Sequence, residues 1–262
     1  VATIAAGHTV TVDGSYTAAA AALTINSTGA LNVTANTLSL ASLNNSGSVT
    51  VSGGALNTTT TITNPGTLTV SGGNVTTTTS MTNSGTLNVS GGTLTTTTTL
   101  TNSSGGNLNL SAGTLAVTTT FSNAGTFTGT GGTLNVTGGA ASGITNSGTF
   151  VVNGVTANLG TVANVNDRTF SSTAGTLTIT TGTLNVNGNM TVSAGAFNQS
   201  GGNINIDGNG STNSVASGTY LLNITTSNVN WTGGTTTIVD PHASGSYAFY
   251  YSGSTASNIT TG

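Results

Sequence analysis

The residues that could carry acid–base or metal chemistry are few, and they are far apart. The chain has one arginine, two histidines, no cysteine and four carboxylates, all of them aspartates. These are Asp13, Asp167, Asp207 and Asp240, and no two lie within 30 residues of each other. Glycoside hydrolysis needs two carboxylates on either side of one bond, so clustered acids would be expected in such an enzyme. We therefore expect no catalytic residues, no cofactor and no enzyme.

The other residues with metal-binding or charged side chains do not form a site either. His8 and His242 lie near opposite ends of the chain, so one metal ion could bind both only if the two ends met. Arg168 follows Asp167 directly, and we interpret the two as an ion pair on the surface. The segment DGNGSTN from Asp207 lacks the later ligands of an EF-hand loop and is interpreted as a turn. No metal site is expected.

Hydroxyl and amide groups are instead the abundant polar groups of this chain. Only 2% of its 262 residues are charged, its net charge is -3, and 34% of its residues are hydrophobic. Disordered chains are usually charged and poor in β-branched residues, whereas this one is rich in threonine and valine. The small negative charge gives no electrostatic attraction to nucleic acid. No apolar run is long enough to span a membrane.

The spacing of these residues is regular. Five asparagines follow one another at steps of 19 residues, and two more follow at steps of 21 and 23: Asn26, Asn45, Asn64, Asn83, Asn102, Asn123 and Asn146. Four apolar columns keep nearly the same step: Leu43, Ile62, Met81, Leu100, Phe121, Ile144; Val49, Leu68, Leu87, Leu108, Phe127, Phe150; Val51, Val70, Val89, Leu110; and Leu56, Val75, Leu94, Leu115. This is the signature of a repeat protein.

Within each repeat the apolar residues alternate with polar ones, as in a half-buried strand. In GTLNVSGG, Leu87 and Val89 share one side and Thr86 and Asn88 the other, and the Ser-Gly-Gly that follows is typical of a turn. No segment shows a helical period. We therefore predict an all-β fold, a β-solenoid (parallel β-helix) with coils of about 19 residues. The alternative is an antiparallel meander of hairpins, which would favour Asn-Gly or Asp-Gly turns.

The threonine runs are then strands of this scaffold. If the strand stays straight, Thr96 and Thr98 share the inward side with Leu94 and Leu100. Inward threonines are expected to hydrogen-bond to the next threonine of their column, because an unpaired buried hydroxyl is costly. Asparagines at the turns are expected to form a similar ladder.

Four segments differ in pattern along one continuous solenoid. Residues 1–25 are N-terminal lead strands, 26–150 hold the regular repeats, 151–219 hold irregular and then looser coils, and 220–262 form an aromatic-rich C-terminal segment. The first residues lack the basic start and the long apolar core of a signal peptide, so we interpret the chain as processed. The lack of lysine removes protease cleavage points. We expect an extracellular or cell-surface protein.

Two stretches carry a family resemblance. AGTLTITTGTLNVNG and NSGTLNVSGGTL resemble the Gly-Thr-Leu-x-Val repeats of secreted bacterial adhesins, including autotransporter-associated repeats. The segment TIAAGHTVTVDGSYTAAAAALTINSTGALNV is similar to the start of repeats in large secreted surface proteins of Bacteroidetes-type bacteria. The resemblance implies a right-handed β-helix displayed outside the cell, without catalytic residues.

A solenoid without charged or helical caps has two open ends, and this predicts head-to-tail assembly of copies of the chain. The expected function is a structural subunit of an extracellular filament or surface fibre. The residues expected at the junctions are Val10, Val12, Tyr247, Phe249, Tyr250 and Tyr251.

Other functions remain open at this stage. The chain could be the stalk of an adhesin that contacts surface glycans or other cells. It could also bind carbohydrate through Trp231 and the tyrosines, or bind ice through a flat grid of threonines. The columns of that grid are Thr59, Thr78, Thr97 and Thr118, beside Thr61, Ser80, Thr99 and Thr120.

Overall fold

The regular structure of the described residues consists of parallel strands alone. The structure is a computed structural model that describes residues 1–14, 18–137, 143–160, 168–206, 220–238, 247–252 and 258–259. These residues form 27 strands and no helix, and each strand pairs in parallel with strands about one coil away. Residues 67–70 pair in parallel with residues 86–89, so the antiparallel meander is excluded. The predicted β-solenoid is confirmed.

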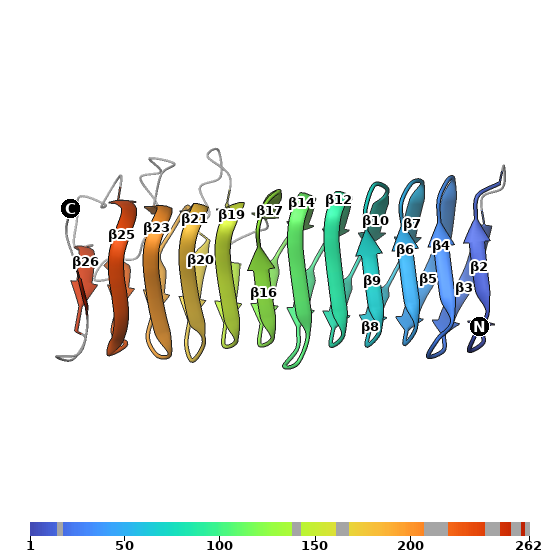
Figure 1. Cartoon of the computed structure of the whole chain (residues 1–262), viewed down its shortest axis with the longest axis horizontal. Coiled ribbons are helices and arrows are strands. Elements are labelled where there is room, and N and C mark those ends of the chain that lie inside the picture. The colour runs from blue at the N-terminus through green and yellow to red at the C-terminus, as the bar shows by residue number, and fades with distance from the viewer. Residues whose placement is uncertain are drawn as a thin grey trace.

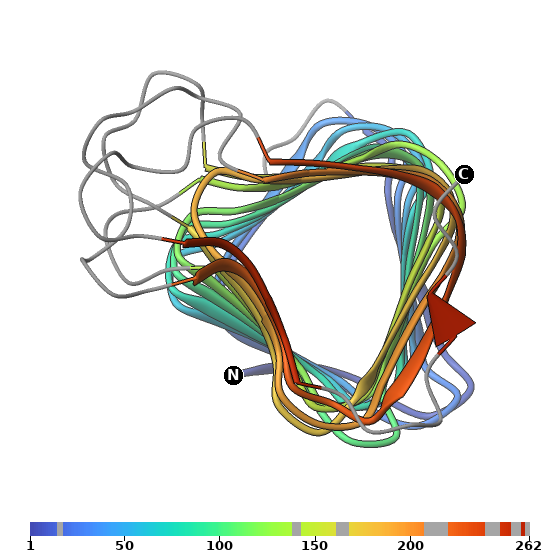
Figure 2. The same ribbon diagram turned by 90° about the vertical axis from the view of Figure 1, so that its left-hand side faces the viewer.

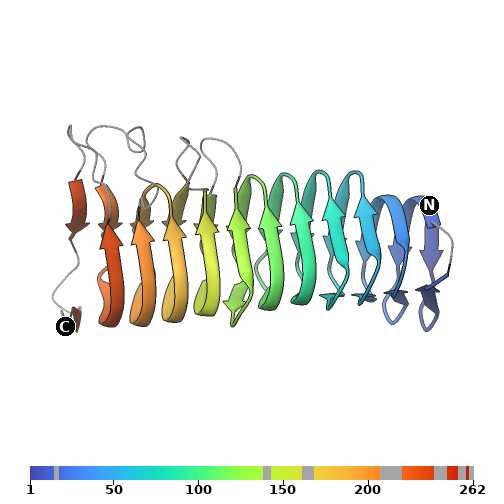
Figure 3. The ribbon, with the colours of Figure 1, turned by 90° about the horizontal axis from the view of Figure 1, so that it is seen from above.

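Each coil adds one strand to each of three parallel sheets, and the chain passes from face 1 to face 2 to face 3. Seen end-on, the coils superpose as a rounded triangle (Figure 2). The strands nearest the viewer in Figure 1 run upward while successive coils advance to the left, so the coils wind in a right-handed sense. Figure 3 shows the same single row of coils from above.

The strands divide among the faces according to their pairing. Face 1 contains β2 (Thr9–Val12), β4 (Ala30–Val33), β6 (Ser48–Val51), β9 (Thr67–Val70), β16 (Thr126–Gly129), β27 (Asn258–Ile259) and the first halves of β12 (Thr86–Thr96), β14 (Asn107–Val117), β19 (Thr149–Leu159), β21 (Thr176–Val186), β23 (Ala196–Ile206) and β25 (Asn228–Ile238). Face 2 contains the second halves of those six long strands, β7 (Ala55–Thr58), β10 (Asn74–Thr77), β17 (Thr133–Val136) and the first halves of β3 (Ala18–Ile25) and β5 (Thr37–Asn45). Face 3 contains the second halves of β3 and β5, β1 (Ala2–Ile4), β8 (Thr61–Asn64), β11 (Ser80–Asn83), β13 (Thr99–Asn102), β15 (Thr120–Asn123), β18 (Gly143–Asn146), β20 (Thr169–Ser172), β22 (Met190–Val192), β24 (Tyr220–Ile224) and β26 (Tyr247–Tyr251).

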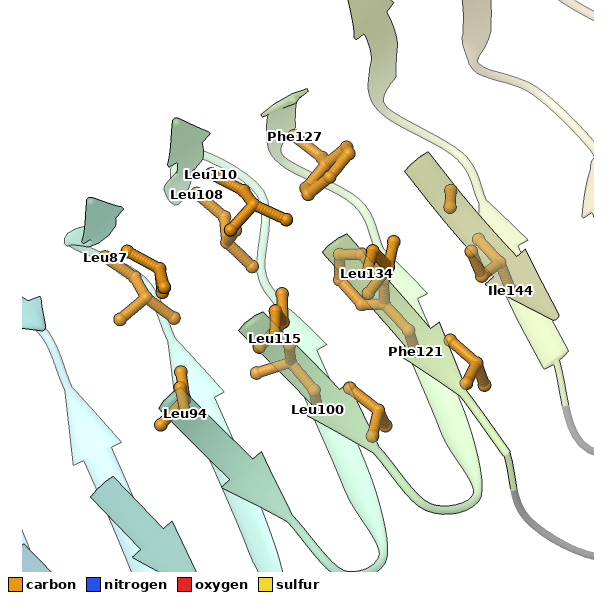
Figure 4. Close-up of a cluster of buried hydrophobic side chains, with 14 of the residues drawn as sticks. Leu87, Leu94, Leu100, Leu108, Leu110, Leu115, Phe121, Phe127, Leu134 and Ile144 are labelled. Atoms are coloured by element: carbon orange, nitrogen blue, oxygen red, sulfur yellow. The ribbon is translucent and has the colours of Figure 1, made fainter. Parts of the chain in front are cut away.

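The core is a set of apolar columns that run along the solenoid. Inward and outward residues alternate along every strand, and Leu68, Leu87 and Leu108 are register partners with fully buried side chains. All four predicted columns are confirmed by strand register and burial. Figure 4 shows leucines of successive coils packed side by side, with Phe121 and Phe127 continuing the columns. The Phe127 and Phe150 rings stack with their centroids 4.4 Å apart.

Glycine makes two of the three corners possible. At the corner between faces 3 and 1, a Cβ atom on Gly85 would lie 2.1 Å from the backbone oxygen of Gly66 in the preceding coil. At the corner between faces 1 and 2, Gly92 has a φ of 61° and a Cβ there would lie 2.0 Å from the Gly73 oxygen. Only a residue without a side chain lets the coils approach this closely.

The alternation of buried and outward positions predicts the effect of charge on stability. Leu87→Asp places a carboxylate without a partner in the core and should lower the free energy of unfolding by at least about 3 kcal/mol. Thr86→Asp adds the same charge to the outward side of the same strand and should change it by no more than about 0.5 kcal/mol. Urea unfolding followed by circular dichroism would measure both. Equal losses in the two variants would disprove the assigned orientation.

Candidate functional site

The described part of the chain contains few groups for acid–base or metal chemistry. His8 and Asp13 are both exposed on the first coil, and the His8 Nδ1 lies 3.0 Å from the backbone oxygen of Ala6. Among the described residues, no three histidines or acids gather in a way that could hold a metal ion. Four of the residues considered from the sequence lie outside the described residues: Asp167, Asp207, Asp240 and His242. The same described part contains no helix long and apolar enough to cross a membrane.

Arg168 is buried, so the expectation that it lies on the surface is wrong. Its side chain has no exposed area, and its Nη2 donates to the backbone oxygen of Thr137 at 3.4 Å. The Arg168 backbone nitrogen also donates to the Asn187 oxygen at 2.8 Å. A Cβ on Gly160 would lie 3.1 Å from the Arg168 Cγ, so the missing side chain there leaves room for the arginine stem.

The main buried polar feature is a ladder of asparagine side chains along face 3. Each Nδ2 donates to the Oδ1 of the asparagine in the next coil, at 2.7 to 2.8 Å. The same Nδ2 groups also donate to backbone oxygens, as Asn45 does to Thr67 at 2.8 Å. The members of the ladder are fully buried, and they are Asn45, Asn64, Asn83, Asn102, Asn123 and Asn146. The predicted asparagine ladder is therefore confirmed for these coils.

The ladder ends where other residues take its position. Asn26 is not a member, contrary to the sequence spacing, because it is exposed and Ile25 is the register partner of Asn45. Isoleucine has no donor, which leaves the buried Asn45 Oδ1 without a hydrogen-bond partner. At the other end, the Ser172 Oγ accepts from the Asn146 Nδ2 at 3.1 Å.

The first column of the predicted threonine grid, from Thr59 to Thr118, lies at the corner between faces 2 and 3, whereas the second column, from Thr61 to Thr120, lies on face 3. The chain bends at residues 97–98, so Thr98 is exposed rather than inward, and the straight-strand assumption is wrong. The Thr78 hydroxyl donates to the Thr59 oxygen and the Thr97 hydroxyl donates to the Thr78 oxygen. The adjacent column is bonded in the same way, from Thr60, Thr79, Thr98 and Thr119 to the preceding coil. These threonines join one coil to the next.

Inward threonines do not form the expected hydroxyl ladder. Thr58, Thr77 and Thr96 are buried in one column of face 2. Only the Thr77 hydroxyl is bonded, and it donates to the backbone oxygen of Thr60 at 2.8 Å. The Oγ1 atoms of Thr58 and Thr96 have no partner. In the next coil a buried valine, Val117, takes the position of this column.

The outward side of face 3 carries the more regular hydroxyl array. Its two columns follow the strands of four successive coils, and none of their hydroxyls has a hydrogen-bond partner among the described residues. One column is Thr61, Ser80, Thr99 and Thr120, and the other is Thr63, Thr82, Thr101 and Ser122. The second column was missed from the sequence, because the bend at the corner changes which residues are neighbours on one flat side.

The two ends of the solenoid have unpaired strand edges. Among the described strands, β1 pairs only with β3 and β2 only with β4, while β26 pairs only with β24 and β27 only with β25. The exposed large hydrophobic side chains of the described residues are all at these ends: Val1 92%, Val10 44%, Phe249 45% and Tyr250 38%.

The two ends expose different kinds of apolar side chain. On the first coil the inward Val10 is exposed, and Val12 and Ala20 are partly buried against the core. On the last coils Trp231 contacts Phe249 edge to face, with the ring centroids 6.3 Å apart, and Tyr220 stacks on Tyr250, with the centroids 4.5 Å apart. The terminal coils contain five of the residues expected at the junctions: Val10, Val12, Phe249, Tyr250 and Tyr251. The side chain of the sixth, Tyr247, lies outside the described set. Ala20 was missed because its strand has no apolar alternation.

The ladder predicts a large cost for replacing one of its central members. In Asn83→Ala, the Asn64 Nδ2 loses an acceptor and the Asn102 Oδ1 loses a donor, both buried. Because each unsatisfied buried group costs about 1–3 kcal/mol, the free energy of unfolding should fall by about 2–6 kcal/mol. Asn88→Ala removes an asparagine from the outward side of the same coil and should cost about 0.5 kcal/mol or less. Urea denaturation that shows equal costs would contradict the structural role of the ladder.

In comparisons with known proteins, no protein-family model, no curated protein and no solved structure matches the chain.

Proposed function

We propose that this chain is the structural subunit of an extracellular filament or surface fibre, in which copies join head to tail. The observation that carries the proposal is the position of the exposed large hydrophobic side chains. Those of the described residues lie on the terminal coils, at the edges where backbone groups are unpaired. The outward sides of the coils between them are formed by short polar residues.

The two ends are complementary in a way that favours an open chain of copies. All strands run in the same sense around the coil, so the first coil of one copy can continue the parallel sheets of the last coil of another. Small aliphatic residues at one end would then cover aromatic residues at the other. Such a contact joins two different surfaces, so it propagates as a filament instead of closing into a dimer.

Two compositional features support a structural role outside the cell. The chain has one arginine and no lysine, which leaves few sites for trypsin-like proteases. Its net charge is only -3 over 262 residues, so electrostatic repulsion between copies would oppose end-to-end association only weakly. The adhesin stalk remains the alternative structural function, and it does not require contact between ends.

Electron microscopy of the purified or refolded protein tests the assembly. The full chain should form filaments much longer than one solenoid. A truncation that lacks residues 247–262, or the single variant Phe249→Asp, should not, because either change removes or charges the exposed apolar surface of the last coil. Thr128→Asp adds the same charge to an outward position of a central coil and should leave filaments intact.

The outcomes separate the candidate structural functions. A full chain that stays strictly monomeric, as rods of a single length, would contradict the filament and favour the stalk. Filaments that persist in Phe249→Asp and in the truncation would show that the terminal coils are not the junction.

The free hydroxyls of face 3 support a second candidate function, ice binding. Outward residues on neighbouring strands lie about 4.8 Å apart, and alternate residues on one strand about 6.6–6.8 Å apart. Threonine is stiff at χ1, so its hydroxyl and methyl groups hold these positions. The array carries no charge, and its hydroxyls are free to bind a periodic ligand, unlike those at the corner.

Thermal hysteresis measures this candidate function directly. Thr101→Tyr puts a bulky side chain into the middle of the free hydroxyl array, and any hysteresis of the unaltered protein should be lost. Thr69→Tyr makes the same change on the outward side of face 1 and should retain it. Circular dichroism would verify that both variants fold. Absence of hysteresis in the unaltered protein at high concentration would eliminate ice binding.

A further inference from the structure

The order of strands around the spiral constrains how two copies can join. The chain always passes from face 1 to face 2 to face 3. The last described strand, β27, lies on face 1, and the first, β1, lies on face 3. One face-2 position therefore separates β27 from the next strand on face 3. The inference that follows rests on the proposed head-to-tail assembly.

If two copies join without rotation, each face continues onto the same face of the next copy. β1 of the incoming copy then covers β26, and β2 covers β27. On face 2, however, the second half of β25 and the first half of the incoming β3 are two strand spacings apart. Among the described strands none fills the position between them, so the edges of both strands are unpaired, at about 9.6 Å instead of the usual spacing of about 4.8 Å. Unpaired backbone groups beside a covered core are costly.

We infer that successive copies are rotated by one face of the triangle, so that the spiral continues without a vacant position. The incoming β1 then pairs with the second half of β25, β2 pairs with β26, and the first half of β3 pairs with β27. Every open edge among the described strands at one end meets an open edge at the other.

The three faces are similar enough for this rotation. In the central coil β9, β10 and β11 are four residues long, and each buries its second and fourth residues. A strand from one face can therefore cover a strand of another without exchanging inward and outward sides. At the rotated junction Val10 and Val12 lie over Phe249 and Tyr251, and Ile4 lies over Ile238.

Cysteine pairs distinguish the two arrangements, because the chain has no cysteine of its own. In the rotated junction Thr3 of one copy lies over Thr237 of another, and Thr11 lies over Tyr250. Without rotation Thr3 lies over Tyr250. Neighbouring residues on paired strands are close enough for a disulfide, and the positions in each pair are at opposite ends of one copy, so only two copies can form the bond.

Three double variants are assembled, oxidised and run on non-reducing gels. Thr3→Cys with Thr237→Cys, and Thr11→Cys with Tyr250→Cys, should each give a ladder of covalent oligomers. Thr3→Cys with Tyr250→Cys should stay monomeric, and it shares one substitution with each of the other pairs. The four single-cysteine variants show how much dimer forms by chance contact.

The results separate this inference from the assembly itself. A ladder only from Thr3→Cys with Tyr250→Cys would overturn the rotation and leave the filament standing. Filaments that give no ladder with any pair would overturn the rotation as well, because neither register would then be correct. Electron micrographs with monomers alone would defeat the filament proposal, and the inference with it.

Discussion

Parallel stacking of each coil on the one before it, residue over equivalent residue, is the constraint from which the rest of the structure follows. A strand in this arrangement pairs its backbone with both neighbouring coils, so each position along the chain meets its own counterpart. Every side chain must therefore be able to pack beside the equivalent side chain of the next coil. Leucine packs on leucine, the asparagine amide donates to the next asparagine, and glycine occupies the corners where backbones nearly touch.

The same constraint explains why the chain is almost uncharged. A charged residue within the repeat would recur in every coil, at about 4.8 Å from its copies. Two like charges at that distance repel by about 1 kcal/mol even in water, and the repulsion accumulates along the column. Threonine, serine and asparagine are polar without this cost, and threonine also fits the strand. The single arginine is consistent with this rule, because it lies at an irregular coil where nothing repeats it.

The periodicity of the sequence predicted the apolar columns, the buried side of each strand and the solenoid fold, because every coil buries the same side of its strands. It did not locate the corners. A step of 19 residues joins Asn26 to Asn45, yet the register joins Ile25 to Asn45, since the register step from β3 to β5 is 20 residues instead of 19. Likewise, the alternation along the sequence assigns Thr98 to the inward side, but the corner at residues 97–98 interrupts the alternation and Thr98 is exposed.

Arg168 was predicted to lie on the surface because charged side chains usually do, and nothing in the neighbouring sequence indicated the space beside Gly160. The role of the terminal residues at the junctions was inferred from the open ends of this fold class, and it stays a prediction.

The direction of the hydrogen bonds has a mechanical consequence. The bonds between coils lie along the length of the solenoid, so tension applied to its ends would pass through each coil interface in turn, while the bonds within one interface would share the load. A structure loaded in this way is as strong as its weakest interface. The central interfaces gain a buried amide bond from the asparagine ladder, whereas the interface between Ile25 and Asn45 has none. Rupture under tension should therefore begin towards the ends, and the middle of the rod should be the last part to yield.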